Sequence, residues 1–153
     1  MDDGSAWPQL ARMTPPPRSR RWTFRLDAEF GHCDATAEVS ELVRDSGVRE
    51  GIVVVSVRGS TGAITTIEYE SGALADLRRA LDRLAPANED YAHNERWGDG
   101  NGFSHVRSAL LKTGITVPVV DGRLDLGTWQ QIVVLNLDNR SREREVVAVV
   151  IPA

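Results

Sequence analysis

The chain has 153 residues, of which 41% are hydrophobic and 26% charged, and its formal net charge is −4. A chain of this length can bury about two thirds of its unfolded surface, which is enough for one domain without stabilising disulfides. The acidic balance argues against general nucleic-acid binding, and no apolar run approaches the roughly 20 residues that a membrane-spanning helix needs. We therefore expect a cytoplasmic protein that has neither nucleic acid nor a membrane among its partners.

The N-terminal stretch differs in composition from the rest of the chain. Residues 1 to 21 combine three consecutive prolines with scattered arginines and show little hydrophobic periodicity. We expect a flexible tail over residues 1 to 21 and a single folded domain over residues 22 to 153.

The first predicted elements are a strand, a helix and a second strand. Residues 22 to 26 alternate apolar and polar side chains, which predicts a half-buried strand. Asp34 offers an N-cap to a helix over residues 35 to 47, which a glycine ends. Residues 51 to 57 are almost all apolar and β-branched, as expected of a central strand that is covered on both faces.

The rest of the chain is predicted to form four strands and two helices. Residues 63 to 70 are rich in Thr, Ile and Tyr and are predicted to form a strand that pairs with residues 51 to 57. Helices are predicted over residues 73 to 85 and over residues 104 to 112. Three β-rich runs follow, at residues 115 to 120, 126 to 138 and 144 to 152. This order predicts an α+β fold, with a mostly antiparallel β-sheet or sandwich and about three helices.

Two carboxylates on the predicted strand at 63 to 70 form the first candidate site. Because side chains alternate along a strand, Glu68 and Glu70 share one face at a spacing of about 7 Å. That spacing suits a shared cation or an acid and base pair, and a solvent-exposed polar face is the alternative.

The turn at residues 58 to 62 is a second candidate. Its glycines allow a backbone to approach an anion closely, and Ser60 and Thr61 add hydroxyls that can hold a phosphate. A plain connection between two strands is the alternative, because the turn lacks the spacing of a phosphate-binding P-loop.

The predicted helix at 104 to 112 carries the third candidate. Its period places Phe103, Val106 and Leu110 on one face and the polar side chains of His105, Ser108 and Lys112 on the other. This polar stripe is either solvated or part of a site.

Nearby residues strengthen the interpretation as a site. His93 lies twelve residues before His105, and proton-transfer and metal sites usually recruit more than one such group. Asn101 stands at the predicted helix N-terminus, where it either caps the helix or contributes to an anion site. Arg58, Arg107 and Arg123 are candidate anion binders.

Several motifs together resemble the YjbQ family, also called secondary thiamine-phosphate synthases. They are GIVVV at 51–55, GSTGAITTIEYE at 59–70, YAH at 91–93, SHVRSALL at 104–111, ITVPV at 115–119 and DGRLDLGTWQ at 121–130. The resemblance covers about residues 22 to 151. It implies an α+β domain, a homotrimer, and a reaction that joins a hydroxymethylpyrimidine diphosphate to a thiazole phosphate with loss of pyrophosphate.

The resemblance also implies a site. His93 and His105 match family histidines that gather in a cleft and hold a divalent metal ion, Mg²⁺ or Zn²⁺, and no organic cofactor is expected. Typical members have a histidine where this chain has Gly59, and an acidic segment where it has Glu68-Tyr69-Glu70. One presumed ligand is therefore missing, and Glu68 or Glu70 is a candidate substitute.

Two functional hypotheses follow. In the first, the chain is a metal-assisted transferase in which His93, His105 and Glu68 are catalytic. In this hypothesis the metal ligands are Glu68, Glu70, His93 and His105, and the groups that hold the phosphorylated substrate are Ser60, Thr61, Asn101, Arg107 and Ser108. In the second, the chain is a non-catalytic or differently employed trimer that binds a small anionic, phosphorylated ligand.

Overall fold

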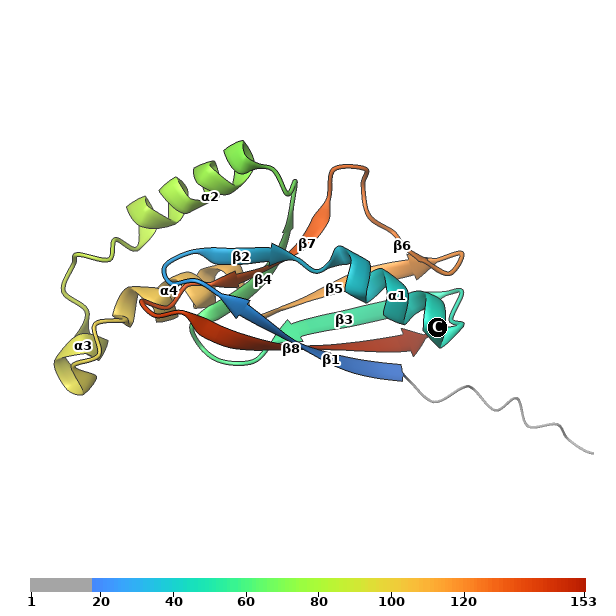
Figure 1. Ribbon diagram of the computed structural model, residues 1–153, viewed down its shortest axis with the longest axis horizontal. Coiled ribbons are helices and arrows are strands. Elements are labelled where there is room, and N and C mark those ends of the chain that lie inside the picture. The colour runs from blue at the N-terminus through green and yellow to red at the C-terminus, as the bar shows by residue number, and fades with distance from the viewer. Residues whose placement is uncertain (1–17) are drawn as a thin grey trace, which may run out of the picture.

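The structure is a computed structural model that describes residues 18–153 (Figure 1). The first strand, β1 (Arg18–Leu26), begins four residues earlier than the alternation in the sequence predicts. Residues 18 to 21, which the sequence assigns to the flexible tail, are therefore part of the domain's sheet. The rest of the predicted tail lies outside the described residues.

Residues 18–153 form two sheets, and the larger one has five antiparallel strands. Their order is β1, β8 (Arg142–Pro152), β3 (Gly51–Val57), β5 (Gly114–Val120) and β6 (Arg123–Leu124). β3 is central, as its apolar sequence predicts. Its burial alternates along the strand, however, so only one face is covered and Ile52 on the other face is 37% exposed.

The smaller sheet has the order β2 (Gly31–Asp34), β7 (Gln131–Asn136) and β4 (Gly62–Ile67). The prediction that β4 pairs with β3 is wrong, because β8 and β5 occupy both edges of β3. β4 pairs with β7 instead. β7 is the strand that is buried on both faces.

Within the described residues, four helices complete the α+β fold, one more than predicted. They are α1 (Thr36–Ser46), α2 (Ser71–Leu84), the short α3 (Ala92–Trp97) and α4 (Gly102–Leu111). None of the helices within residues 18–153 is both long and apolar enough to span a bilayer.

Two hydrophobic cores lie on the two faces of the smaller sheet. The first core fills the space between the two sheets and includes Leu42 and Val43 of α1. The second packs Leu74 and Leu81 of α2 against the opposite face of β7. Figure 1 shows the resulting layers, with α2 lying over the smaller sheet and α3 and α4 at one end of the molecule.

A buried polar network joins the two sheets near the turn that precedes β4. Arg144 Nη2 donates to Thr61 O at 2.9 Å and to Thr61 Oγ1 at 2.8 Å. Thr61 Oγ1 donates to Asp138 Oδ2 at 3.0 Å, and Arg142 Nε donates to the same oxygen at 2.9 Å. Asn136 Oδ1 accepts a further bond from Arg144 Nε at 3.1 Å.

The network sets the charge state of its carboxylate. Burial alone raises the pKa of Asp138, but hydrogen bonds from Thr61 and Arg142 and the charges of Arg142 and Arg144 outweigh burial and lower it. The stabilising contribution of Asp138 is therefore complete above its unfolded pKa of about 3.9. It is lost as the pH falls through the lower pKa of the folded state.

We predict that Asp138→Ala lowers the free energy of unfolding by about 3–5 kcal/mol, because it leaves the buried Arg144 guanidinium without its counter-charge. Urea denaturation at pH 7 measures this loss. Asp76→Ala is the matched control, since it breaks an ion pair to Arg79 in which the Asp76 side chain is 67% exposed. The control should change stability by less than about 1 kcal/mol. Equal losses in both variants would contradict the assigned role of Asp138.

Candidate histidine site

Two imidazoles from neighbouring helices face each other at one end of the molecule. His93 lies on α3 and His105 on α4, and their ring centroids are 4.3 Å apart with the ring planes inclined by 46°. Both side chains are partly buried. The structure thus brings together the two histidines that the sequence predicts as partners.

Glycines set the close approach of the two helices. A side chain at Gly102 would collide with Cβ of Tyr91, so α4 can begin against the start of α3 only without one. Asn94 Oδ1 accepts a hydrogen bond from Gly102 N at 2.8 Å. The connecting loop turns through Gly98 and Gly100, both at positive φ, where glycine is favoured. These local requirements hold the two rings near each other.

Asp99 and Asn101 surround one nitrogen of His93. Asp99 Oδ2 lies 3.4 Å from His93 Nε2. When the Asn101 carboxamide is oriented so that its nitrogen faces these groups, this nitrogen lies 3.2 Å from His93 Nε2 and 3.1 Å from Asp99 Oδ1. When Nε2 carries a proton, the Asp99 carboxylate can accept a hydrogen bond from it. When Nε2 carries none, the Asn101 carboxamide can donate a hydrogen bond to it. Both neighbours can therefore orient the His93 ring through hydrogen bonds.

Unpaired polar atoms lie on the elements around this cluster. Asn139 Nδ2 donates to Asp99 O at 2.9 Å, which ties the β7–β8 turn to the loop of the site, while Asn139 Oδ1 is buried and has no partner among residues 18–153. Ser104 Oγ, next to His105 in α4, is also buried and unpaired within the described chain. Such atoms usually find a water or ligand partner.

Two of the predicted substrate-binding residues are already engaged inside the fold. Arg107 is buried, with Nε donating to Ala85 O at 2.9 Å and Nη2 at 2.9 Å from Asp82 Oδ1. Ser108 Oγ donates to Gly62 O at 2.6 Å. Both side chains hold α4 against its neighbours, so neither is free to grip a phosphate.

The predicted faces of α4 are therefore wrong in part. Phe103 is buried as expected, but Val106 is 40% and Leu110 54% exposed, while the polar Arg107 and Ser108 point inward. Hydrogen-bond acceptors at Ala85 and Gly62 explain this orientation, because they satisfy the buried polar groups.

The two hydroxyl residues of the turn have different environments. Thr61 is buried and both its hydroxyl and its carbonyl belong to the network with Arg144. Ser60 is exposed. Of the residues predicted to hold phosphate, Ser60 is the one whose side chain is exposed and makes no hydrogen bond within residues 18–153, because Asn101 is buried against His93 and Asp99.

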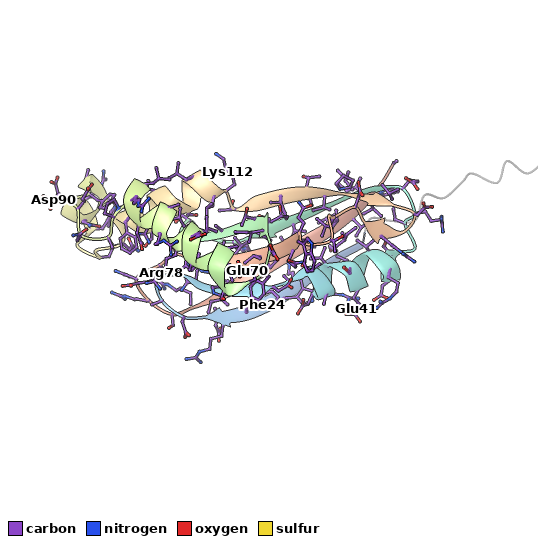
Figure 2. All side chains as sticks on the ribbon, turned by 90° about the horizontal axis from the view of Figure 1, so that it is seen from above. Phe24, Glu41, Glu70, Arg78, Asp90 and Lys112 are labelled. Atoms are coloured by element: carbon purple, nitrogen blue, oxygen red, sulfur yellow. The ribbon has the colours of Figure 1, made fainter. Side chains whose placement is uncertain are left out.

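The two glutamates lie apart from the histidines. β4 ends at Ile67, so Glu68 and Glu70 do not share a strand face, and Glu70 caps α2 by accepting hydrogen bonds from Gly72 N and Ala73 N. These bonds lower the pKa of Glu70. Figure 2 shows Glu70 far from Asp90, the residue two positions before α3. The 14 residues of α2 span about 20 Å at 1.5 Å per residue.

The predicted metal ligands therefore do not form one set within a chain. Among residues 18–153, no three His, Cys, Asp or Glu side chains are arranged to hold a metal ion. A catalytic zinc site needs three protein ligands, and the histidine pair supplies two. The four-residue metal site predicted from Glu68, Glu70, His93 and His105 does not fit the geometry of a single chain.

The third histidine belongs to a different place, which the sequence did not reveal. His32 Nδ1 lies 3.0 Å from the hydroxyl of Tyr69, and burial lowers the pKa of His32. This pair lines a hollow of about 440 Å³ beside α2. β2, which carries His32, has only four residues, too few to be predicted as a strand from the sequence.

A family model described as "UPF0047 protein YjbQ-like" matches residues 20–153. A UPF0047 protein of Methanothermobacter thermautotrophicus is 42% identical over 116 residues, which cover 76% of this chain and 80% of the relative. A UPF0047 protein of Archaeoglobus fulgidus is 34% identical over 114 residues, with coverage of 74% and 86%.

Solved structures agree with this similarity. A YbjQ-like protein of unknown function from Sulfolobus solfataricus superposes with a TM-score of 0.79 at 27% identity, covering 90% of this chain and 99% of its own. A hypothetical protein from Aeropyrum pernix has a TM-score of 0.81 at 28% identity, with coverage of 89% and 99%.

We predict that the dialysed protein and His93→Ala contain equal, substoichiometric amounts of zinc and magnesium, because the histidine pair has no third ligand among residues 18–153. Elemental analysis of both proteins measures this, with His32→Ala as the control for loss of any imidazole. A stoichiometric metal ion that disappears only in His93→Ala would contradict the prediction and require a ligand from another copy.

Proposed function

Because the chain belongs to the YjbQ-like family of UPF0047 proteins, we propose that it is a thiamine-phosphate synthase-like transferase whose acid–base groups are His93 and His105. The observation that carries this proposal is the pairing of the two rings at 4.3 Å beside Asp99 and Asn101. An imidazole can act as a general acid or base, because its ring nitrogens can donate or accept a hydrogen bond.

The proposed reaction forms one bond and breaks one. The thiazole nitrogen attacks the methylene carbon of the pyrimidine, and the bond from that carbon to the diphosphate oxygen breaks with its electron pair. One protonated imidazole of the pair donates its proton to the departing pyrophosphate oxygen, which lowers the cost of its developing charge. The proton returns to the imidazole from solvent.

Asp99 and Asn101 act as positioning residues in this proposal. They contact His93 Nε2 in both of its protonation states and so orient the ring through the proton transfer. We propose that Mg²⁺ enters with the diphosphate substrate, since Mg²⁺ sites commonly combine one or two carboxylates with substrate phosphates. None of the steps assigned to the chain passes through a resident metal ion.

The second candidate is a non-catalytic trimer that binds a small phosphorylated ligand. Gly59 in place of the histidine expected at the turn favours it, as does the engagement of Thr61 and Arg107 inside the fold. The two candidates differ in whether the bound ligands are converted to product.

A homotrimer is part of the proposal, and the outer face of the five-stranded sheet supports it. Ile52 pairs with Pro118 on one side and with Ile151 on the other, so three apolar residues form a row across three strands. All three are exposed in the single chain. An apolar row of this kind is typical of a surface that another copy covers.

We predict that the protein converts hydroxymethylpyrimidine diphosphate and thiazole phosphate to thiamine phosphate, and that His105→Ala lowers the rate at least about 100-fold. Chromatographic detection of thiamine phosphate with excess Mg²⁺ measures the rate. His32→Ala, which removes an imidazole outside the site, should keep the wild-type rate. Ligand binding without any product above the His105→Ala level would reject the transferase and leave the binding protein.

We also predict that the wild-type chain has the mass of three chains by light scattering and that Ile52→Glu has the mass of one. The substitution places a charge in the apolar row, where its burial against another copy is unfavourable. Leu84→Glu makes the same change at an exposed leucine on α2 and should leave the trimer intact. A monomeric wild type, or dissociation in both variants, would contradict the assignment of this face.

A further inference from the structure

A second cavity lies between α1 and the segment that connects β5 to β7. It has a volume of about 490 Å³ and is lined by Thr36, Ser40 and Arg44 of α1 on one side and by residues of 122–131 on the other. Small-molecule sites usually have volumes of roughly 300–1,000 Å³. Figure 1 shows α1 and β6 at the opposite end of the molecule from α3, so the cavity is separate from the histidine site.

The charge of this cavity differs from that of the chain. The lining includes the side chains of Arg44 and Arg123 and contains no Asp or Glu. The chain as a whole has 22 acidic residues against 18 basic ones. A cavity with two guanidinium groups and no carboxylate in an acidic protein is electrostatically selective for an anion.

Both arginines are available to a ligand. Among residues 18–153, Arg123 has no carboxylate at ion-pair distance, and Arg44 reaches only Glu41 at 3.8 Å across the helix surface. The hydroxyls of Ser40 and Thr128 also make no hydrogen bond to the described part of the chain. The cavity therefore offers guanidinium and hydroxyl donors that the fold itself does not use.

The walls of the cavity are held in place by hydrogen bonds. Gln130 Oε1 accepts from Gly127 N at 3.1 Å, and its Nε2 donates to Thr66 Oγ1 at 3.0 Å. On the other wall, Thr36 Oγ1 accepts from Ile132 N at 2.8 Å, which fixes the start of α1 to β7. A preformed site of this kind loses little conformational entropy when a ligand binds.

We propose that this cavity binds a small phosphate monoester with an apolar body. Arg44 and Arg123 hold the phosphate, since guanidinium groups match the geometry of phosphate oxygens. Ser40 and Thr128 add hydroxyl donors, and Leu124 and Leu126 contact the apolar part of the ligand. The site is independent of the proposed transferase reaction.

Calorimetric titration of the full-length protein with phenyl phosphate, and separately with inorganic phosphate, tests the proposal. Phenyl phosphate should bind more tightly than inorganic phosphate, because it alone can contact the two leucines. Arg44→Gln and Arg123→Gln should each raise the Kd for phenyl phosphate about tenfold or more, as expected for loss of a charge-assisted hydrogen bond. Arg79→Gln, the same change at an exposed arginine on α2, should leave the Kd unchanged.

His105→Ala separates this proposal from the proposed function. If phenyl phosphate binding survives in His105→Ala and is lost in Arg123→Gln, the cavity beside α1 is the site. If binding is absent in the wild type, or is lost in His105→Ala but not in the two arginine variants, the proposal is overturned. Equal weakening in Arg79→Gln would also overturn it, since the effect would then reflect net charge alone.

Discussion

The structure depends on one buried interaction, the network of Asp138 and Arg144 with Thr61. It joins β8 of the larger sheet to the end of β7 and to the turn before β4, so it sets the relation between the two sheets. The next residue, Asn139, extends the connection to the loop of Asp99. A buried charge of this kind costs much when unpaired, which restricts the turn and the loop to one arrangement. Because Asp99 contacts His93, the same hydrogen bond from Asn139 also helps to position the histidine site.

Much of the fold could be predicted from local patterns. The central strand β3 and the amphipathic helices α1 and α2 follow from short-range periodicity, and Gly47 ends α1 as expected for a residue at positive φ. The pairing of β4 with β7 could not be predicted, because it depends on which strands occupy the edges of β3. The sequences of β3 and β7 are both apolar runs. The sequence therefore does not show which of the two strands is buried on both faces.

The histidine pair of the site could be predicted from the sequence, but the roles of the other predicted site residues could not. The polar loop before α4, flanked by glycines, pointed to His105 and Asn101, and the preceding histidine completed the pair. The hydrogen bonds that turn Arg107 and Ser108 inward have acceptors far away in the sequence, so helical periodicity placed Ser108 on the wrong face. Glu70 is a helix cap and not a strand residue, because β4 ends at Ile67, three residues earlier than predicted.

We propose that ligands bind the protein at His93 and His105. Diethylpyrocarbonate labelling of the three histidines, mapped by mass spectrometry with and without the two thiamine precursors, tests it most directly. We expect the precursors to protect His93 and His105 together, while His32 reacts as it does without them. Protection of His32 alone, with undiminished labelling of His93 and His105, would contradict it.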